Sequence, residues 1–134
     1  MSTVAPARTA TVADTRARIV NASYELFARR SIRDVAMDEV IAASGVAKAT
    51  VYRHFPTKDD LVLAFLQHRE EVWTIGTLQA GVRERAADAE GRLLAIFDVF
   101  DEWFHREDFE ACTFVNVLLE MGADHPLGRA STSH

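Results

Sequence analysis

The segment from residue 45 to residue 58 gathers side chains whose types could hold phosphate groups and touch base edges. Lysine and arginine bring positive charge to phosphates, and hydroxyl or phenol groups donate neutral hydrogen bonds to them. Val51 and Phe55 stand four residues apart, which predicts the inward face of a helix and leaves the polar side chains outside. The chemistry indicated is noncovalent contact with a nucleic acid. The side chains concerned are Lys48, Thr50, Tyr52, Arg53, His54 and Lys58.

Two short helices joined by a tight turn must position these side chains. The stretch Ile41–Leu61 reads as the end of one helix, a turn, a second helix over about Ala47–Phe55, and a new start after Pro56. Gly45 supplies the positive φ that ends the first of these helices. This is the layout of a helix-turn-helix, whose second helix enters a DNA groove.

Each polar side chain receives an expected role from its place on this helix. Lys48 and His54 are expected to touch base edges, because the front of such a helix meets the groove floor. Arg53 fits a phosphate clamp and a solvated cation equally well. The side chains expected to hold phosphates are Thr50, Tyr52 and Lys58.

The rest of the chain is helical in pattern, with no repeats and no useful β-alternation, so the expected fold class is all-α. Asp14 is expected to open the first helix, Asp34 to cap the second, and Thr57 to begin a fourth that supports the small head. Gly76 and Gly81 predict fraying or a break in that fourth helix. Further helices are expected near residues 89–105 and 112–121. The expected divisions are a flexible arm (1–13), a helix-turn-helix DNA-binding domain (14–60), a partial helical regulatory domain (61–122) and a tail (123–134).

Charge is divided unevenly along the chain. The overall net charge is −5, but residues 1–58 hold nine basic and five acidic side chains, net +4. Residues 59–134 hold six basic and fifteen acidic side chains, net −9. A basic head on an acidic body is expected when one end meets phosphates; chance unevenness of solvated faces is the alternative.

Aromatic side chains of the body are candidates for an apolar ligand pocket, although their helical spacing is equally typical of core packing. His105, Asp108 and Cys112 lack a regular spacing of metal ligands, and Cys112 is interpreted as a small buried hydrophobe. No catalytic constellation or phosphate-binding loop stands out, so we expect no enzyme, cofactor or metal. The pocket candidates are Trp73, Phe97, Phe100, Trp103 and Phe104, with Phe109 beside them.

The head resembles the DNA-binding domain of the TetR family of bacterial transcription regulators over about residues 14–64. The matching helix-turn-helix residues are Gly45, Val46, Lys48, Thr50, Tyr52, Arg53, His54, Phe55 and Lys58. The matching first-helix residues are Ile19, Val20, Ala22, Leu26 and Phe27. The stretch 111–116 is similar to part of the ligand domain of some members. The resemblance implies a double-stranded DNA operator, repression relieved by a small apolar effector, and a homodimer.

Several positions depart from the family pattern. Val35 and Ala36 stand where a hydroxyl pair is usual, Ala47 replaces a capping Ser, and Ile41 replaces an Ala. Members also continue with two long helices that pair with a second subunit, whereas this chain ends after residues 123–134. The dimer interface is therefore expected to be missing. The alternatives are a truncated interaction protein that pairs with a full-length relative, or a ligand-binding module without DNA activity.

Composition places the expected site of action in the cytoplasm. The single cysteine cannot form an internal disulfide, which suits a reducing compartment. No run approaches the roughly 18 apolar residues of a membrane span, and the first residues lack the apolar stretch of a secretory signal.

Overall fold

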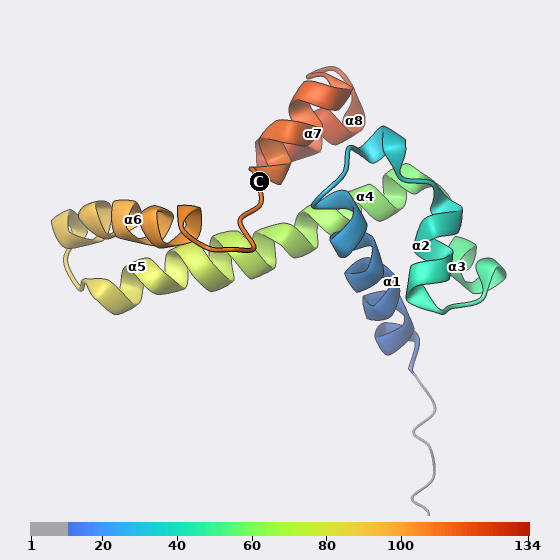
Figure 1. Ribbon diagram of the computed structural model, residues 1–134, viewed down its shortest axis with the longest axis horizontal. Coiled ribbons are helices and arrows are strands. Elements are labelled where there is room, and N and C mark those ends of the chain that lie inside the picture. The colour runs from blue at the N-terminus through green and yellow to red at the C-terminus, as the bar shows by residue number, and fades with distance from the viewer. Residues whose placement is uncertain (1–10) are drawn as a thin grey trace, which may run out of the picture.

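The computed structural model describes residues 11–134, and in that range every regular element is a helix, which confirms the all-α prediction. Helices α1–α3 gather around the first half of a long helix, α6 runs back along its second half, and α7 and α8 pair beside its first half (Figure 1). The elements are α1 (Val12–Phe27), η1 (Ile32–Asp34), α2 (Met37–Ser44), α3 (Lys48–His54), α4 (Lys58–Arg69), η2 (Glu70–Gln79), α5 (Ala80–Arg85), α6 (Ala89–Phe104), α7 (Thr113–Met121) and α8 (Pro126–Ser133).

Helix α1 begins two residues before the predicted start at Asp14. The Thr11 hydroxyl accepts from the Asp14 amide at 3.1 Å, and the Asp14 carboxylate accepts from the Thr11 amide at 3.1 Å. This reciprocal capping box fixes the first turn at Val12. The predicted arm (1–13) therefore reaches too far, and residues 1–10 lie outside the described residues.

Asp34 does not cap α2 as predicted. It lies in the 3₁₀ turn η1, where its carboxylate accepts from the Ser31 hydroxyl at 2.8 Å. The N-cap of α2 is Ala36, whose amide donates to the Glu39 carboxylate at 2.9 Å. Glu39, inside the helix, thus makes one of the two hydrogen bonds of a capping box. Ala36 has no side-chain oxygen to make the other.

The fourth helix is continuous from Lys58 to Arg85, so the predicted break at Gly76 and Gly81 is wrong. Its middle, η2, widens into π-helical turns, and the Thr77 hydroxyl donates to the Val72 carbonyl five residues earlier at 3.2 Å. A glycine inside a helix costs only about 1 kcal/mol, which the packing of this helix against α6 offsets.

The predicted tail (123–134) folds into α8. Pro126 occupies the first turn, and the His125 ring nitrogen accepts from the Leu127 amide at 3.1 Å, which caps the helix. Leu127 is completely buried. Gly128 lies so close to the preceding turn that a Cβ there would stand 1.9 Å from the Gly122 carbonyl oxygen. Small residues in this segment permit close packing instead of marking a flexible end.

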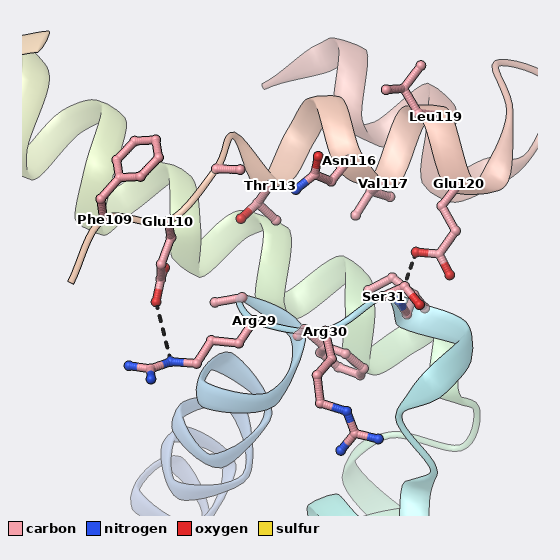
Figure 2. Close-up of a pocket in the computed structure, with 14 residues that line it drawn as sticks. Arg29, Arg30, Ser31, Phe109, Glu110, Thr113, Asn116, Val117, Leu119 and Glu120 are labelled. Atoms are coloured by element: carbon pink, nitrogen blue, oxygen red, sulfur yellow. Dashed lines mark hydrogen bonds and ion pairs between the residues drawn. The ribbon is translucent and has the colours of Figure 1, made fainter. Parts of the chain in front are cut away.

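Two carboxylates of the body attach it to the head (Figure 2). The Glu120 carboxylate on α7 accepts from the backbone amides of Ile32 at 2.8 Å and Arg33 at 2.7 Å. Glu110 accepts from the buried Arg69 guanidinium on α4 at 3.1 Å. Arg69 also donates to the Tyr24 hydroxyl on α1. The body therefore holds both η1 and the end of α1.

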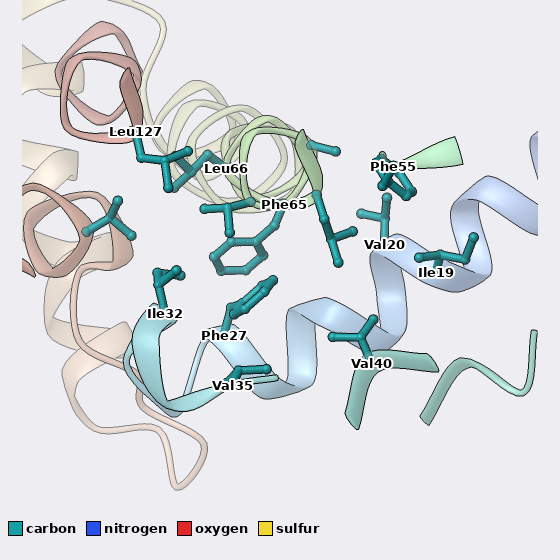
Figure 3. Packing of buried hydrophobic residues seen from close by; sticks show 14 of the residues in the cluster. Ile19, Val20, Phe27, Ile32, Val35, Val40, Phe55, Phe65, Leu66 and Leu127 are labelled. Carbon is teal, nitrogen blue, oxygen red and sulfur yellow. The ribbon is translucent and has the colours of Figure 1, made fainter. Parts of the chain in front are cut away.

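One hydrophobic core joins the head to α4 (Figure 3). The Phe65 ring lies 5.4 Å from the Phe27 ring and 5.5 Å from the Tyr24 ring. Leu66 of α4 and Leu127 of α8 extend this cluster toward the body. The prediction that the small head needs the following helix for support is confirmed.

We expect Phe65→Ala to destabilise the protein by about 3–5 kcal/mol, because it removes a completely buried aromatic ring at the centre of this core. Urea denaturation followed by circular dichroism measures the change. Leu63→Ala is the control, since Leu63 lies on the exposed side of the same helix and its loss should cost far less. Equal losses from the two substitutions would contradict the central role of Phe65.

Candidate nucleic-acid interface

The turn between α2 and α3 is held by backbone geometry and by one arginine. Gly45 adopts φ 63°, the left-handed conformation predicted for it. The Ser44 hydroxyl accepts from the Val46 amide at 3.1 Å, which orders the turn. The Arg18 guanidinium on α1 donates to the Ser44 carbonyl at 3.0 Å. Helix α1 thereby fixes the point from which α3 departs.

Helix α3 has one buried face. Val51 is completely buried and Phe55, its C-cap, is 2% exposed. Successive residues of a helix are turned by about 100°, so Arg53 lies opposite this pair. Tyr52 then falls on one flank of the exposed face, and Lys48 is exposed at the first position of the helix. A helix with this arrangement presents its polar side to whatever lies outside the protein.

All six predicted contact residues retain an accessible surface in the structure. Tyr52 is 38% exposed. Thr50 and His54 are half-buried on the second flank of α3, and Lys58 is half-buried in the first turn of α4. The structure thus places the six side chains on two adjacent helices. The more exposed members are Lys48, Tyr52 and Arg53.

Lys48 has a partner that the sequence interpretation missed. Its ammonium group lies 3.3 Å from the Asp38 carboxylate on α2, and both side chains are mostly exposed. Exposed ion pairs of this kind contribute little stability, about 0–1 kcal/mol, and exchange readily for another anion. A phosphate or an acceptor on a base edge can therefore compete for Lys48.

Two further cations support this face and were also missed. Besides Arg18, Arg16 lies with its guanidinium 5.2 Å from the centre of the Phe55 ring. Arg16 stands three residues before the buried Ile19, so both lie on the same face of α1. The helical spacing of the sequence could therefore have predicted that Arg16 faces the core side of this helix. The contact of Arg18 depends on the packing of α1 against the turn and leaves no local trace in the sequence.

The residues that depart from the family pattern at the starts of α2 and α3 differ in their surroundings. Val35 is completely buried in the core, so this position faces away from solvent. Ala47 is the N-cap of α3 and makes no side-chain cap, as expected. Glu39, which receives the Ala36 amide, pairs with Arg30 at 2.7 Å, and this hydrogen bond holds the pKa of Glu39 below its ordinary value.

The aromatic pocket candidates do not all come together. Trp73 lies 4.7 Å from Trp103 and 5.6 Å from Phe100, measured between ring centres, and Phe104 stacks on Trp103 at 5.6 Å. Phe97 is 69% exposed and makes no aromatic contact with the described residues, because it lies on the outer face of α6. The grouping of Phe97 with this cluster is therefore wrong.

The structure also corrects the interpretation of Cys112 as buried. Cys112 is the exposed N-cap of α7, at the end of a loop. Across residues 11–134, His, Cys, Asp and Glu side chains form no group that could hold a metal ion. None of the helices in that range is long and apolar enough to span a membrane.

The sequence comparisons concern mainly the head. The family model described as "Bacterial regulatory proteins, tetR family" matches residues 19–65. The HTH-type transcriptional repressor Rv3405c of Mycobacterium tuberculosis is 39% identical over 82 residues, covering 59% of this chain and 44% of that protein. The HTH-type transcriptional activator FasR of Mycolicibacterium smegmatis is 30% identical over 95 residues, covering 69% of this chain and 41% of that protein. The chain thus spans less than half the length of these curated relatives.

The structural comparisons extend over most of the chain. SCO4454, a TetR-family transcriptional regulator from Streptomyces coelicolor, superposes with a TM-score of 0.82 at 30% identity, covering 91% of this chain and 64% of that one. The reduced form of NemR from E. coli superposes with a TM-score of 0.67 at 20% identity, covering 90% of this chain and 62% of that one. The second likeness concerns the fold alone.

We expect Ala47→Ser to stabilise the protein by about 0.5–2 kcal/mol, because a serine hydroxyl at the N-cap can accept from an unpaired amide in the first turn of α3. Thermal unfolding followed by circular dichroism measures the gain. Ala49→Ser is the control, since it adds the same hydroxyl at an exposed position inside the helix. If Ala47→Ser gave no more stability than Ala49→Ser, the first backbone amides of α3 would not need a capping side chain.

Proposed function

We propose that this chain, whose head matches the model of the TetR family of bacterial regulatory proteins over residues 19–65, is a regulator of that family and binds an operator in double-stranded DNA through α3. The observation that carries the proposal is the orientation of α3. Val51 and Phe55 are buried, so the polar side chains of the helix face outward. The basic balance of residues 1–58 favours approach to phosphates.

The residues of the interface divide by the contact that each can make. Thr50, Tyr52 and Lys58 hold phosphates, which fixes the position of α3 on the duplex. Lys48 touches base edges from the first turn of α3, and His54 does so from one flank of the exposed face. Arg53 lies at the centre of that face, and this position favours a groove contact over a role as a solvated cation.

We further propose that the protein is a cytoplasmic repressor relieved by a small effector. Support for repression comes from the repressor of M. tuberculosis, which is more similar to this chain than the activator FasR is. A pair of heads would read two half-sites of an operator, because one short helix reaches only a few bases. The homodimer and the effector are both parts of the proposal.

A helical interaction protein is the second candidate function, and an exposed apolar surface favours it. Leu93, Leu94 and Phe97 on α6 are each more than half exposed, and so is Leu119 on α7. Such side chains can pair with another chain without any contact between the head and DNA. Sedimentation of the protein with and without a duplex separates the candidates, since only the regulator sediments with DNA.

We expect Lys58→Ala to weaken binding to all duplexes alike and to lower the salt dependence by about one counterion, because Lys58 contacts a phosphate. Fluorescence anisotropy at a series of salt concentrations, with a duplex selected from a random library, measures both effects. Arg83→Ala removes an exposed cation from α5, remote from the interface, and should change neither. An unchanged salt slope for Lys58→Ala would remove this residue from the interface.

Lys48→Ala is expected to act on sequence preference. Loss of a base-edge contact typically lowers discrimination at one position by about 1–3 kcal/mol. Repeating the selection from the random library with the variant should yield a site in which one position has become degenerate. A site identical to that of the unaltered protein would assign Lys48 to a phosphate or to its ion pair with Asp38 alone.

A further inference from the structure

A hollow of the structure lies between the head and the body, away from the aromatic cluster. It is a groove of about 700 Å³ between the segment 27–32, at the end of α1, and the segment 109–120, which includes α7 (Figure 2). Ligand sites of small molecules have volumes of this order. Of the aromatic residues proposed from sequence as pocket lining, Phe109 borders this groove, and the other five do not.

A buried hydroxyl without a partner belongs to the wall of this groove. Thr113 is 4% exposed, and its hydroxyl makes no hydrogen bond to the described residues. Polar groups buried in this way are normally paired, so an unpaired one calls for an explanation. Asn116 lies one turn further along α7 on the same wall and is exposed. Both residues can donate a hydrogen bond to an acceptor in the groove.

Two arginines line the groove: Arg30 is hydrogen-bonded to Glu39 at 2.7 Å, whereas Arg29 makes only long ion pairs. Glu110 is occupied by Arg69, and Glu120 by two backbone amides of η1. Arg29 stands 3.9 Å from both Glu25 and Glu110, which is beyond hydrogen-bonding distance. These contacts are long ion pairs of an exposed side chain, for which another carboxylate can compete, whereas Glu110 and Glu120 are held by shorter hydrogen bonds. The groove favours an acceptor that carries negative charge.

The remaining lining is apolar. Phe27, Ile32 and Val117 are buried beneath the groove, and the more exposed side chains of Phe109 and Leu119 form its rim. A ligand with a carboxylate near Arg29 can place an apolar tail along these residues. Such a tail would cover rim side chains that are now open to solvent.

We propose that this groove binds a small amphipathic carboxylate, held by Arg29, Thr113 and Asn116 at its head and by apolar contacts along its tail. Its occupation is coupled to the head through Glu120, which holds η1 by two hydrogen bonds. Because η1 leads within three residues into α2, displacement of η1 shifts the helix-turn-helix. Occupation therefore weakens operator binding, and this last step alone rests on the proposed function.

Nuclear magnetic resonance of the full chain tests the site without DNA. Octanoate is the probe, and 1-octanol, which keeps the tail and loses the carboxylate, is the reference ligand. Octanoate should bind about fivefold or more tightly than octanol. The amide signals of residues 28–33 and 110–120 should move, whereas the indole signals of Trp73 and Trp103 should not.

Two variants assign the contacts. Arg29→Gln should abolish the preference for octanoate, and Arg83→Gln, at an exposed site on α5, should preserve it. Thr113→Val keeps the shape of the side chain and removes the unpaired hydroxyl. It should weaken octanoate binding and at the same time raise the melting temperature, a combination that a purely structural threonine would not give. Thr74→Val on η2 is its control.

Three outcomes would overturn the proposal: no saturable shift with octanoate, shifts centred on the indoles, or an unaltered affinity in Arg29→Gln. Operator binding is measured separately by anisotropy with and without saturating octanoate. Binding in the groove with no duplex bound under any condition would reject the proposed function and keep the site. Binding of both ligands with no mutual effect would reject the coupling through η1.

Discussion

The structure depends on the burial of one face of α4 against the head. Helices α1, α2 and α3 are too short to enclose a core of their own, and Phe65 of α4 fills the space between them. Because α4 is continuous with η2 and α5, the same burial that folds the head also joins it to the body. A direct connection between the head and the body follows, because both use the same core residues of this helix.

Helix α3 is formed by its surroundings more than by its own sequence. It has seven residues, and its N-cap Ala47 offers no side-chain oxygen. Isolated helices of this length are unstable in water, so the burial of Val51 and Phe55 must hold it. Two apolar residues therefore hold the helix against the core, and its remaining side chains are available for contacts outside the protein.

Local signals in the sequence were sufficient for the turn and for both ends of α3. Gly45, Pro56 and the pair Thr57–Asp60 act through their immediate neighbours, and the structure has them as predicted. The errors concern segments whose conformation depends on distant residues. Small residues near Gly128 looked like a flexible end, yet they permit close packing of α8. In the candidate site, helical spacing was enough to predict that Val51 and Phe55 are buried. It could not predict the partners of Lys48 and Ser44, because these partners lie on other helices.

The acidic character of the body has a second consequence besides keeping it away from DNA. Two of its carboxylates, Glu110 and Glu120, turn toward the head and hold Arg69 and the amides of η1. These are connections between groups far apart in the chain, and they lie at the two ends of one groove. A hydrogen bond to a charged group is stronger than one between neutral groups, so these two points resist separation more than the apolar contacts between them. Because both carboxylates also line the groove, they are the charged groups that connect its walls to α4 and η1, beside the core that head and body share.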